Sequence, residues 1–271
     1  MIAALFAFLF GLLIGSFLNV CIHRWPRDLS VVRPRSFCPR CEKTIAWYDN
    51  IPILSYILLG GKCRHCGARI PLRYPVVELL TGAAFFHFVS TLGVTPAALK
   101  MCVFAALLVG LVFSDLEERI LPDEMTLGGT LLGILFAVFV RMPESVPSFV
   151  VIIATHSELT GRAQWLTEAA FGALLPALFL WFGAWVYERI RHREGLGLGD
   201  VKLIAMVGSF LGLSGALYTL MLGSVAGSLI GFTYIRATGK DASTYELPFG
   251  TFLGLAALAV GVFMRQLLGA V

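Results

Sequence analysis

Long apolar runs, separated by short polar segments, make up most of the chain. A helix that crosses a bilayer needs about 20 predominantly apolar residues, and most of the runs approach that length. The candidate spans are Ile2–Val20, Val76–Leu92, Ala97–Ser114, Met125–Val140, Ala169–Tyr187, Val201–Leu213, Gly215–Ile235 and Phe249–Leu268. The pattern predicts an all-α polytopic membrane protein with about eight transmembrane helices. The first run has no basic region before it and no cleavage site, so we interpret it as a retained helix.

The sixth run, Val201–Leu213, is too short to span a bilayer as a straight helix. It follows three alternating glycines, Gly195, Gly197 and Gly199, and begins directly after Asp200. Broken or half-length helices of this kind line water-filled cavities in membrane proteins. Glycine has no Cβ, so we expect these three positions to let another backbone, that of a substrate, approach closely.

Composition narrows the class of protein. The chain of 271 residues is 58% hydrophobic and 14% charged, with a mean hydropathy of +0.82. Membrane lipids are therefore expected partners. Aromatic and basic residues do not alternate along one stripe, which gives no support for a nucleic-acid partner.

The distribution of basic residues predicts the topology. With eight spans, seventeen lysines and arginines fall on one side of the membrane and four on the other. The positive-inside rule then predicts a cytoplasmic 21–74 segment and two outside termini.

The 21–74 segment carries two Cys-x-x-Cys pairs, Cys38 with Cys41 and Cys63 with Cys66, separated by 21 residues. Two such pairs are typical of a closed structural zinc site with four thiolate ligands. Disulfides are the alternative, which a reducing cytosol disfavours. A redox-active pair would not explain why there are two. The sequence predicts three parts: a first helix (1–20), a zinc-binding domain (21–74) and a seven-helix core (75–271).

Two acids stand at the cytoplasmic ends of predicted helices. Asp115 ends the third span and Asp200 begins the sixth, so both are expected at one depth. Taken alone, Asp200 could simply cap its helix. As a pair, two close carboxyl groups cannot both ionise and share one proton. One partner then activates water and the other protonates a peptide carbonyl oxygen, which is aspartic protease chemistry.

The combination of a Gly-x-Gly-Asp motif, an earlier aspartate at a helix end and a four-cysteine loop resembles the type IV prepilin peptidases. These are bacterial membrane aspartic proteases that also serve type II secretion. Further stretches that match are Gly15–Val20 running to Pro26, Asn50–Tyr56, Arg73–Glu78 and Leu247–Gly250. The segment Arg141–Trp165 and Thr251, where the family more often has proline, depart from the family pattern. Neither departure is expected to touch the aspartate pair.

The resemblance implies a bacterial inner-membrane enzyme that cleaves the basic leader of prepilins or pseudopilins at the cytoplasmic face. It implies that Asp115 and Asp200 are catalytic. The family's bacterial members typically also methylate the new N-terminal residue, usually phenylalanine, with S-adenosylmethionine. Nothing else in the sequence supports that second activity. Glu78, a third acid at membrane depth, is a weak candidate for the methyl-donor site or else an interface residue.

Other functions remain open at this point. One alternative is a leader peptidase that does not methylate its product. Another is a proton-coupled transporter in which the two aspartates relay protons, although no repeat between halves is visible. A zinc-dependent hydrolase would need an open coordination position, which four thiolates do not leave. Within 141–165, the short apolar stretch 148–154 is expected to be an interfacial or packed piece of an outer loop. Lys202 is expected to reach the lipid headgroups.

Overall fold

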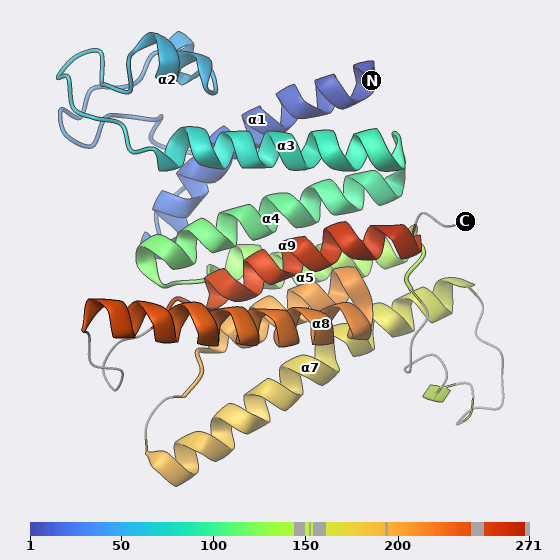
Figure 1. Cartoon of the computed structure of the whole chain (residues 1–271). Coiled ribbons are helices and arrows are strands. Elements are labelled where there is room, and N and C mark those ends of the chain that lie inside the picture. The colour runs from blue at the N-terminus through green and yellow to red at the C-terminus, as the bar shows by residue number, and fades with distance from the viewer. Residues whose placement is uncertain (144–149, 152, 154–160, 193–194, 240–246, 269–271) are drawn as a thin grey trace. The chain divides into compact units, whose positions relative to one another are not determined.

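The computed structural model describes residues 1–143, 150–151, 153, 161–192, 195–239 and 247–268. Helices account for nearly all of the regular structure in this part of the chain (Figure 1). The longer helices are α1 (Ile2–Arg24), α3 (Arg73–Leu92), α4 (Pro96–Glu118), α5 (Asp123–Ala137), α7 (Gly161–Arg191), α8 (Leu198–Thr238) and α9 (Phe249–Leu268). Between α1 and α3 lie the short helix α2 (Leu54–Leu58) and the 3₁₀ turns Trp25–Arg27 and Trp47–Asn50. The predicted all-α class is confirmed.

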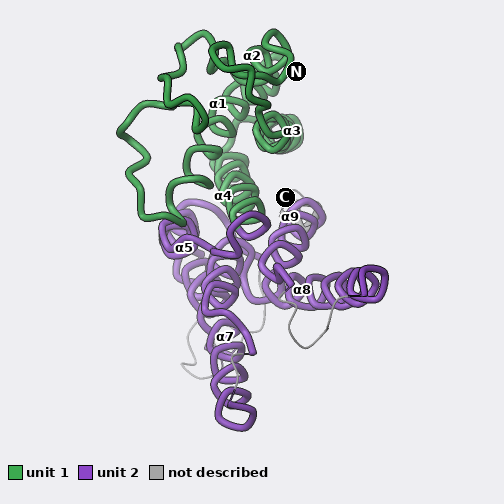
Figure 2. The backbone as a smooth tube through the Cα atoms, turned by 90° about the vertical axis from the view of Figure 1, so that its left-hand side faces the viewer, with its two compact units in different colours: residues 1–114 green, residues 115–271 purple. Residues whose placement is uncertain are grey.

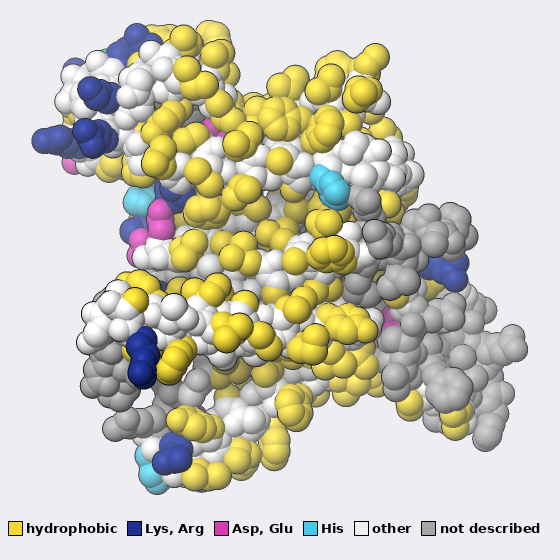
Figure 3. Space-filling model, viewed as in Figure 1, with side chains coloured by type: hydrophobic (Ala, Val, Ile, Leu, Met, Phe, Trp, Pro, Cys, Tyr) yellow, Lys and Arg dark blue, Asp and Glu magenta, His cyan; other side chains and the backbone are white. Residues whose placement is uncertain are grey.

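Five of these helices, α1, α3, α4, α7 and α8, are long and apolar enough to cross a membrane, and α9 contains a shorter apolar stretch. Each of the eight predicted spans falls on a helix, except that α5 ends at Ala137, three residues before its predicted end. Many large apolar side chains point outward, including Phe6 and Phe179, which are 67% and 76% exposed. Apolar side chains cover much of the visible helix surface in Figure 3. A surface of this kind requires lipid as its solvent.

The long helix α8 is broken at Gly212, where the backbone adopts φ 74° and ψ −177°. Only glycine adopts this conformation readily, because a Cβ would clash with the neighbouring peptide groups. The break separates a short helical segment, 198–211, from a longer one that ends at Thr238. The two spans predicted around Gly212 are therefore separate helical segments, and the short one carries Asp200.

Helix α7 begins earlier than the sequence predicts. It starts at Gly161, so residues 161–165 of the predicted outer loop 141–165 belong to a helix. The predicted span began at Ala169, because Arg162, Gln164 and Glu168 interrupt the apolar run. Glu168 is fully buried in α7. Most of the interfacial piece predicted at 148–154 lies outside the described residues.

The chain forms two compact units, 1–114 and 115–271, with the division inside α4 (Figure 2). In the first unit, α1 packs along α3. Their backbones approach closely because glycines line the contact: a Cβ on Gly15 would lie 2.6 Å from the Cα of Glu78, and one on Gly11 would lie 2.8 Å from the Cα of Gly82. Small residues at such crossings are a common means of helix association in membranes.

In the second unit, backbone contacts hold the short segment 198–211 from two sides. A Cβ on Gly208 would overlap the carbonyl group of Gly172 in α7. On another face, Gly133 of α5 lies directly against the side chain of Ser209. Residues 203, 204, 206, 207, 210 and 211 are all buried. The segment that carries Asp200 is thus fixed between α5 and α7.

We expect Gly212→Ala to lower the free energy of unfolding by about 1–3 kcal/mol, because alanine is strained at this φ and ψ. Thermal unfolding in detergent measures the loss. The matched control is Gly183→Ala in α7, where a Cβ would meet nothing within 4 Å. An equal response of both variants would contradict the assigned strain.

Candidate functional site

Asp115 lies in the last turn of α4 and is 5% exposed. The helix ends soon after it, because Arg119 adopts a left-handed conformation (φ 55°) and Pro122 cannot continue a helix. The backbone N–H of Arg119 donates to the carbonyl of Asp115 at 3.0 Å, which completes the final turn. The Asp115 side chain is therefore held at a helix end with little contact with solvent.

Asp200 lies in the first turn of α8 and is 9% exposed. Its N–H donates to the carbonyl of Gly197 at 3.1 Å, which starts the helix. The Asp115 and Asp200 carboxyl groups are near enough for their charges to interact. Asp115 stands at the end of α4 and Asp200 at the start of α8, and both are buried in the 115–271 unit.

Thr251 in the first turn of α9 binds Asp115. Its backbone N–H and its hydroxyl both donate to Asp115 Oδ2, at 2.6 Å and 2.8 Å. The expectation that Thr251 would not touch the aspartate pair was therefore wrong. The adjacent Gly250 explains the close approach, because a Cβ there would lie 3.2 Å from Asp115 Cγ. Apart from the unusual residue itself, nothing in the sequence signals this contact, since 136 positions separate the partners.

The three glycines before Asp200 have different surroundings. A Cβ on Gly195 would overlap the ring of Tyr187, and one on Gly199 would lie 3.2 Å from Leu121 Cβ. These two glycines accommodate side chains of the protein itself. A Cβ on Gly197 would meet nothing nearer than Asp200 Oδ2, at 3.7 Å. The predicted approach of a substrate backbone stays a prediction, and Gly197 is the position with room for it.

Lys202 forms an ion pair with Asp123 of α5, with Nζ 2.6 Å from Oδ1. This ion pair is not evident from the sequence, which predicts only that Lys202 reaches the lipid headgroups. Asp123 lies in the first turn of α5. Both side chains are partly exposed, so the pair contributes little to stability and mainly marks the contact of the two helix starts.

The four cysteines predicted as metal ligands converge. Their sulfur atoms all lie within 4.8 Å of one another, with Cys38 Sγ 3.8 Å from Cys66 Sγ and Cys41 Sγ 4.0 Å from Cys63 Sγ. A tetrahedral ion with metal–sulfur bonds of about 2.3 Å would place its ligands roughly 3.8 Å apart. All six cysteines lie in the described part of the chain and are free of disulfides. The cluster fits one metal ion.

The two cysteine pairs share one backbone pattern. In the first pair, the N–H of Cys38 donates to Lys43 O and the N–H of Glu42 donates to Cys38 O. In the second pair, the N–H of Cys63 donates to Ala68 O and the N–H of Gly67 donates to Cys63 O. These turns direct backbone N–H groups toward sulfur. The N–H groups of Cys66 and His65 lower the pKa of Cys63 to about 6, which favours its thiolate form. Thiolates are the form that ligates metals.

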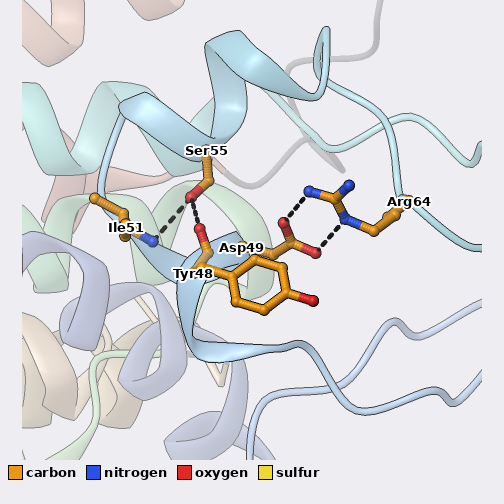
Figure 4. Close-up of polar contacts among 5 residues, drawn as sticks. All are labelled: Tyr48, Asp49, Ile51, Ser55 and Arg64. Atoms are coloured by element: carbon orange, nitrogen blue, oxygen red, sulfur yellow. Dashed lines mark hydrogen bonds and ion pairs between the residues drawn. The ribbon is translucent and has the colours of Figure 1, made fainter.

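An ion pair joins the second cysteine pair to the turn Trp47–Asn50 (Figure 4). Arg64 Nε and Nη2 donate to the two carboxylate oxygens of Asp49 at 2.8 Å and 2.6 Å. These bonds hold the pKa of Asp49 below its ordinary value. Next to it, the Ser55 hydroxyl donates to Tyr48 O and accepts from Ile51 N–H, both at 2.9 Å. These contacts are not evident from the sequence.

Glu78 in α3 also holds the loop. Its Oε2 accepts the backbone N–H of Ile53 at 2.8 Å, and the Ser16 side chain is a second hydrogen-bond partner. Ile53 has a left-handed φ of 60°, which is rare for a β-branched residue, so the bond stabilises a strained start of α2. The observed contacts of Glu78 are thus structural. Its role in binding a methyl donor stays a prediction.

A helical membrane bundle with two interacting aspartates at helix ends and a four-thiol cluster defines the class of an intramembrane aspartic peptidase with a metal-binding loop. The family model "Bacterial Peptidase A24 N-terminal domain" matches residues 9–92, and "Type IV leader peptidase family" matches residues 102–232. The chain belongs to the type IV leader peptidase family. No solved structure matches it.

Several relatives carry the name prepilin leader peptidase/N-methyltransferase. That of Myxococcus xanthus is 41% identical over 243 residues, which cover 90% of this chain and 66% of the relative. That of Aeromonas salmonicida is 35% identical over 276 residues, covering 92% of this chain and 87% of the relative. That of Pseudomonas aeruginosa is 34% identical over 275 residues, with 92% and 86% covered. The chain is thus shorter than each of these relatives.

We expect Cys38→Ala to abolish stoichiometric metal binding, because three thiolates leave a coordination position open to water and chelators. Elemental analysis of the purified, dialysed protein measures the metal content. The matched control is Cys102→Ala, since Cys102 is buried in α4 outside the cluster. Retention of a full equivalent of metal by Cys38→Ala would exclude the four-thiolate site.

Proposed function

We propose that this chain removes the leader peptides of type IV prepilins or type II secretion pseudopilins and then methylates the new N-terminus. Family membership and the names of its relatives support this activity. The observation that carries the assignment to residues is the pairing of Asp115 with Asp200 at two helix ends. We assign these two aspartates as the catalytic pair.

The proposed reaction needs one proton shared between the two carboxyl groups. The ionised carboxylate takes a proton from water, and the water oxygen attacks the peptide carbonyl carbon. The protonated partner donates to the carbonyl oxygen, giving a tetrahedral intermediate. Collapse of that intermediate breaks the C–N bond: the carboxyl group that took the water proton gives it to the leaving amine, and its partner takes a proton back from a hydroxyl of the intermediate. Water is consumed, and both carboxyl groups regain their starting state.

Membrane depth explains how such a substrate would meet the site. A prepilin-like chain keeps its apolar helix in the bilayer and its basic leader in the cytosol. The bond between them then lies at the end of the spanning helices, the level at which Asp115 and Asp200 stand. The excess of lysine and arginine in the 21–74 segment supports a cytoplasmic site in the inner membrane. On this topology both termini lie outside.

For the second activity, S-adenosylmethionine would supply the methyl group to the amine released by cleavage. This assignment rests on the names of the relatives. The four-cysteine cluster supports zinc as a structural ion, because four thiolates at tetrahedral spacing leave no position for substrate or water. Zinc would stabilise a loop that has only short helical turns of its own.

Mass spectrometry of a co-expressed prepilin tests the proposal. We expect the wild-type enzyme to yield a shortened, singly methylated product, and Asp115→Ala and Asp200→Ala to leave the precursor intact. Loss of either carboxyl group removes the acid–base pair and lowers the cleavage rate by at least about 10³-fold. Asp→Asn variants, checked for wild-type thermal stability, exclude misfolding as the cause.

Glu124→Ala is the matched control for these variants. Glu124 is an exposed acid in the first turn of α5. Its removal should leave both cleavage and methylation unchanged. Normal leader removal by either Asp115→Ala or Asp200→Ala would refute the assigned pair.

Gly197→Ala tests the approach of the substrate backbone. Gly197 has φ −68° and ψ 140°, which alanine adopts without strain, so the fold should be retained. The added Cβ would stand 3.7 Å from Asp200 Oδ2, in space that a substrate backbone would need. We expect KM for a prepilin substrate to rise several-fold while thermal stability stays constant. An unchanged KM would remove this role from Gly197, and Gly128→Ala, at an open position in α5, is the control.

A further inference from the structure

Helix α9 begins with backbone N–H groups that its own preceding residue cannot satisfy. The first N–H groups of any helix lack partners within it, and a polar residue before the helix usually accepts one of them. Here Pro248 precedes the helix and has no side-chain acceptor. The acceptor is Asp115, which receives the N–H of Thr251 at 2.6 Å from a position 136 residues earlier in the chain. Asp115 therefore caps a helix other than its own.

The Thr251 hydroxyl reinforces this contact on the same oxygen. It donates to Asp115 Oδ2 at 2.8 Å, and the threonine side chain is 4% exposed, so water does not compete freely for the bond. A carboxyl group with one bond can still turn about its Cβ–Cγ axis. Here the N–H and the hydroxyl of Thr251 both donate to Asp115 Oδ2, and the backbone of Gly250 lies close to the carboxyl group. These contacts restrict that rotation.

The two aspartates are held differently. Asp200 accepts no hydrogen bond on its carboxylate from any residue that the structure describes, and it interacts with Asp115 through charge. Asp115 Oδ2 accepts two hydrogen bonds and is therefore not the oxygen that holds the proton shared by the pair. Thr251 breaks the symmetry of the pair in this way.

We propose that Thr251 is a positioning residue that fixes the orientation of the Asp115 carboxyl group for cleavage through its N–H and its hydroxyl. This inference rests on the proposed peptidase function. A proline at position 251 would carry neither donor, so the contact depends on the residue that this chain has. Because Thr251 acts through Asp115 and not on substrate, its loss should affect turnover more than substrate affinity.

Steady-state cleavage of a prepilin-like substrate by the full-length purified enzyme tests this. Thr251→Val keeps the shape and the backbone N–H but removes the hydroxyl. We expect kcat to fall about tenfold, the usual effect of losing one hydrogen bond to a charged group, with KM changed less than about twofold. Thr251→Ser restores the hydroxyl and should recover kcat to within about threefold of the wild type.

Thr219→Val is the matched control. Thr219 is fully buried in α8, and its hydroxyl donates to Gly215 O within its own helix, so the same chemical change is made away from Asp115. We expect it to leave kcat unchanged. Wild-type kcat in Thr251→Val, or an equal loss in Thr251→Ser, would overturn the inference. So would a fall in thermal stability beyond that of the control. Asp115→Ala in the same assay separates the two hypotheses, because normal cleavage by that variant refutes the catalytic pair itself.

Discussion

The burial of two carboxyl groups at the ends of membrane helices governs the arrangement of the 115–271 unit. An acid at this depth is costly unless donors or favourable dipoles surround it. Asp115 receives two hydrogen bonds from the start of α9, where the helix dipole also favours negative charge. Asp200 stands at the start of α8 and benefits from the dipole of its own helix. The two helix starts thus compensate for placing like charges side by side.

Close packing of backbones keeps these charges in place. The short segment 198–211 is held against α7 at Gly172 and against α5 at Gly133, and it is separated from the rest of α8 by the break at Gly212. Gly250 brings α9 within reach of Asp115 in the same manner. Lipid provides no hydrophobic force between helices, so contacts of this kind are a principal source of specificity in a membrane protein. A methyl group at Gly208 would overlap the carbonyl group of Gly172, so this contact requires glycine.

Much of this arrangement could be predicted from the sequence. Each of the eight apolar runs coincides with a helix in the part of the chain that the structure describes, apart from the last three residues of the fourth run, because backbone hydrogen bonding in lipid leaves few alternatives to a helix. The spacing of the cysteines predicted that their sulfur atoms converge, because a tetrahedral metal ion needs all four thiolates close together. The contacts of single side chains could not be predicted. Thr251, which departs from the family pattern, was expected to lie away from the aspartate pair. Gly195 and Gly199 were expected to face a substrate, but they face Tyr187 and Leu121. Only the tertiary fold decides which distant residues meet.

The two cysteine turns also differ in one backbone detail. The position after the second cysteine is left-handed in both, but it is Glu42 in the first turn and Gly67 in the second. A non-glycine residue in that conformation costs about 1 kcal/mol or more, whereas glycine adopts it freely. The second turn therefore holds its two cysteines at a lower conformational cost than the first, so a shared ion would have to offset more backbone strain on the Cys38–Cys41 side.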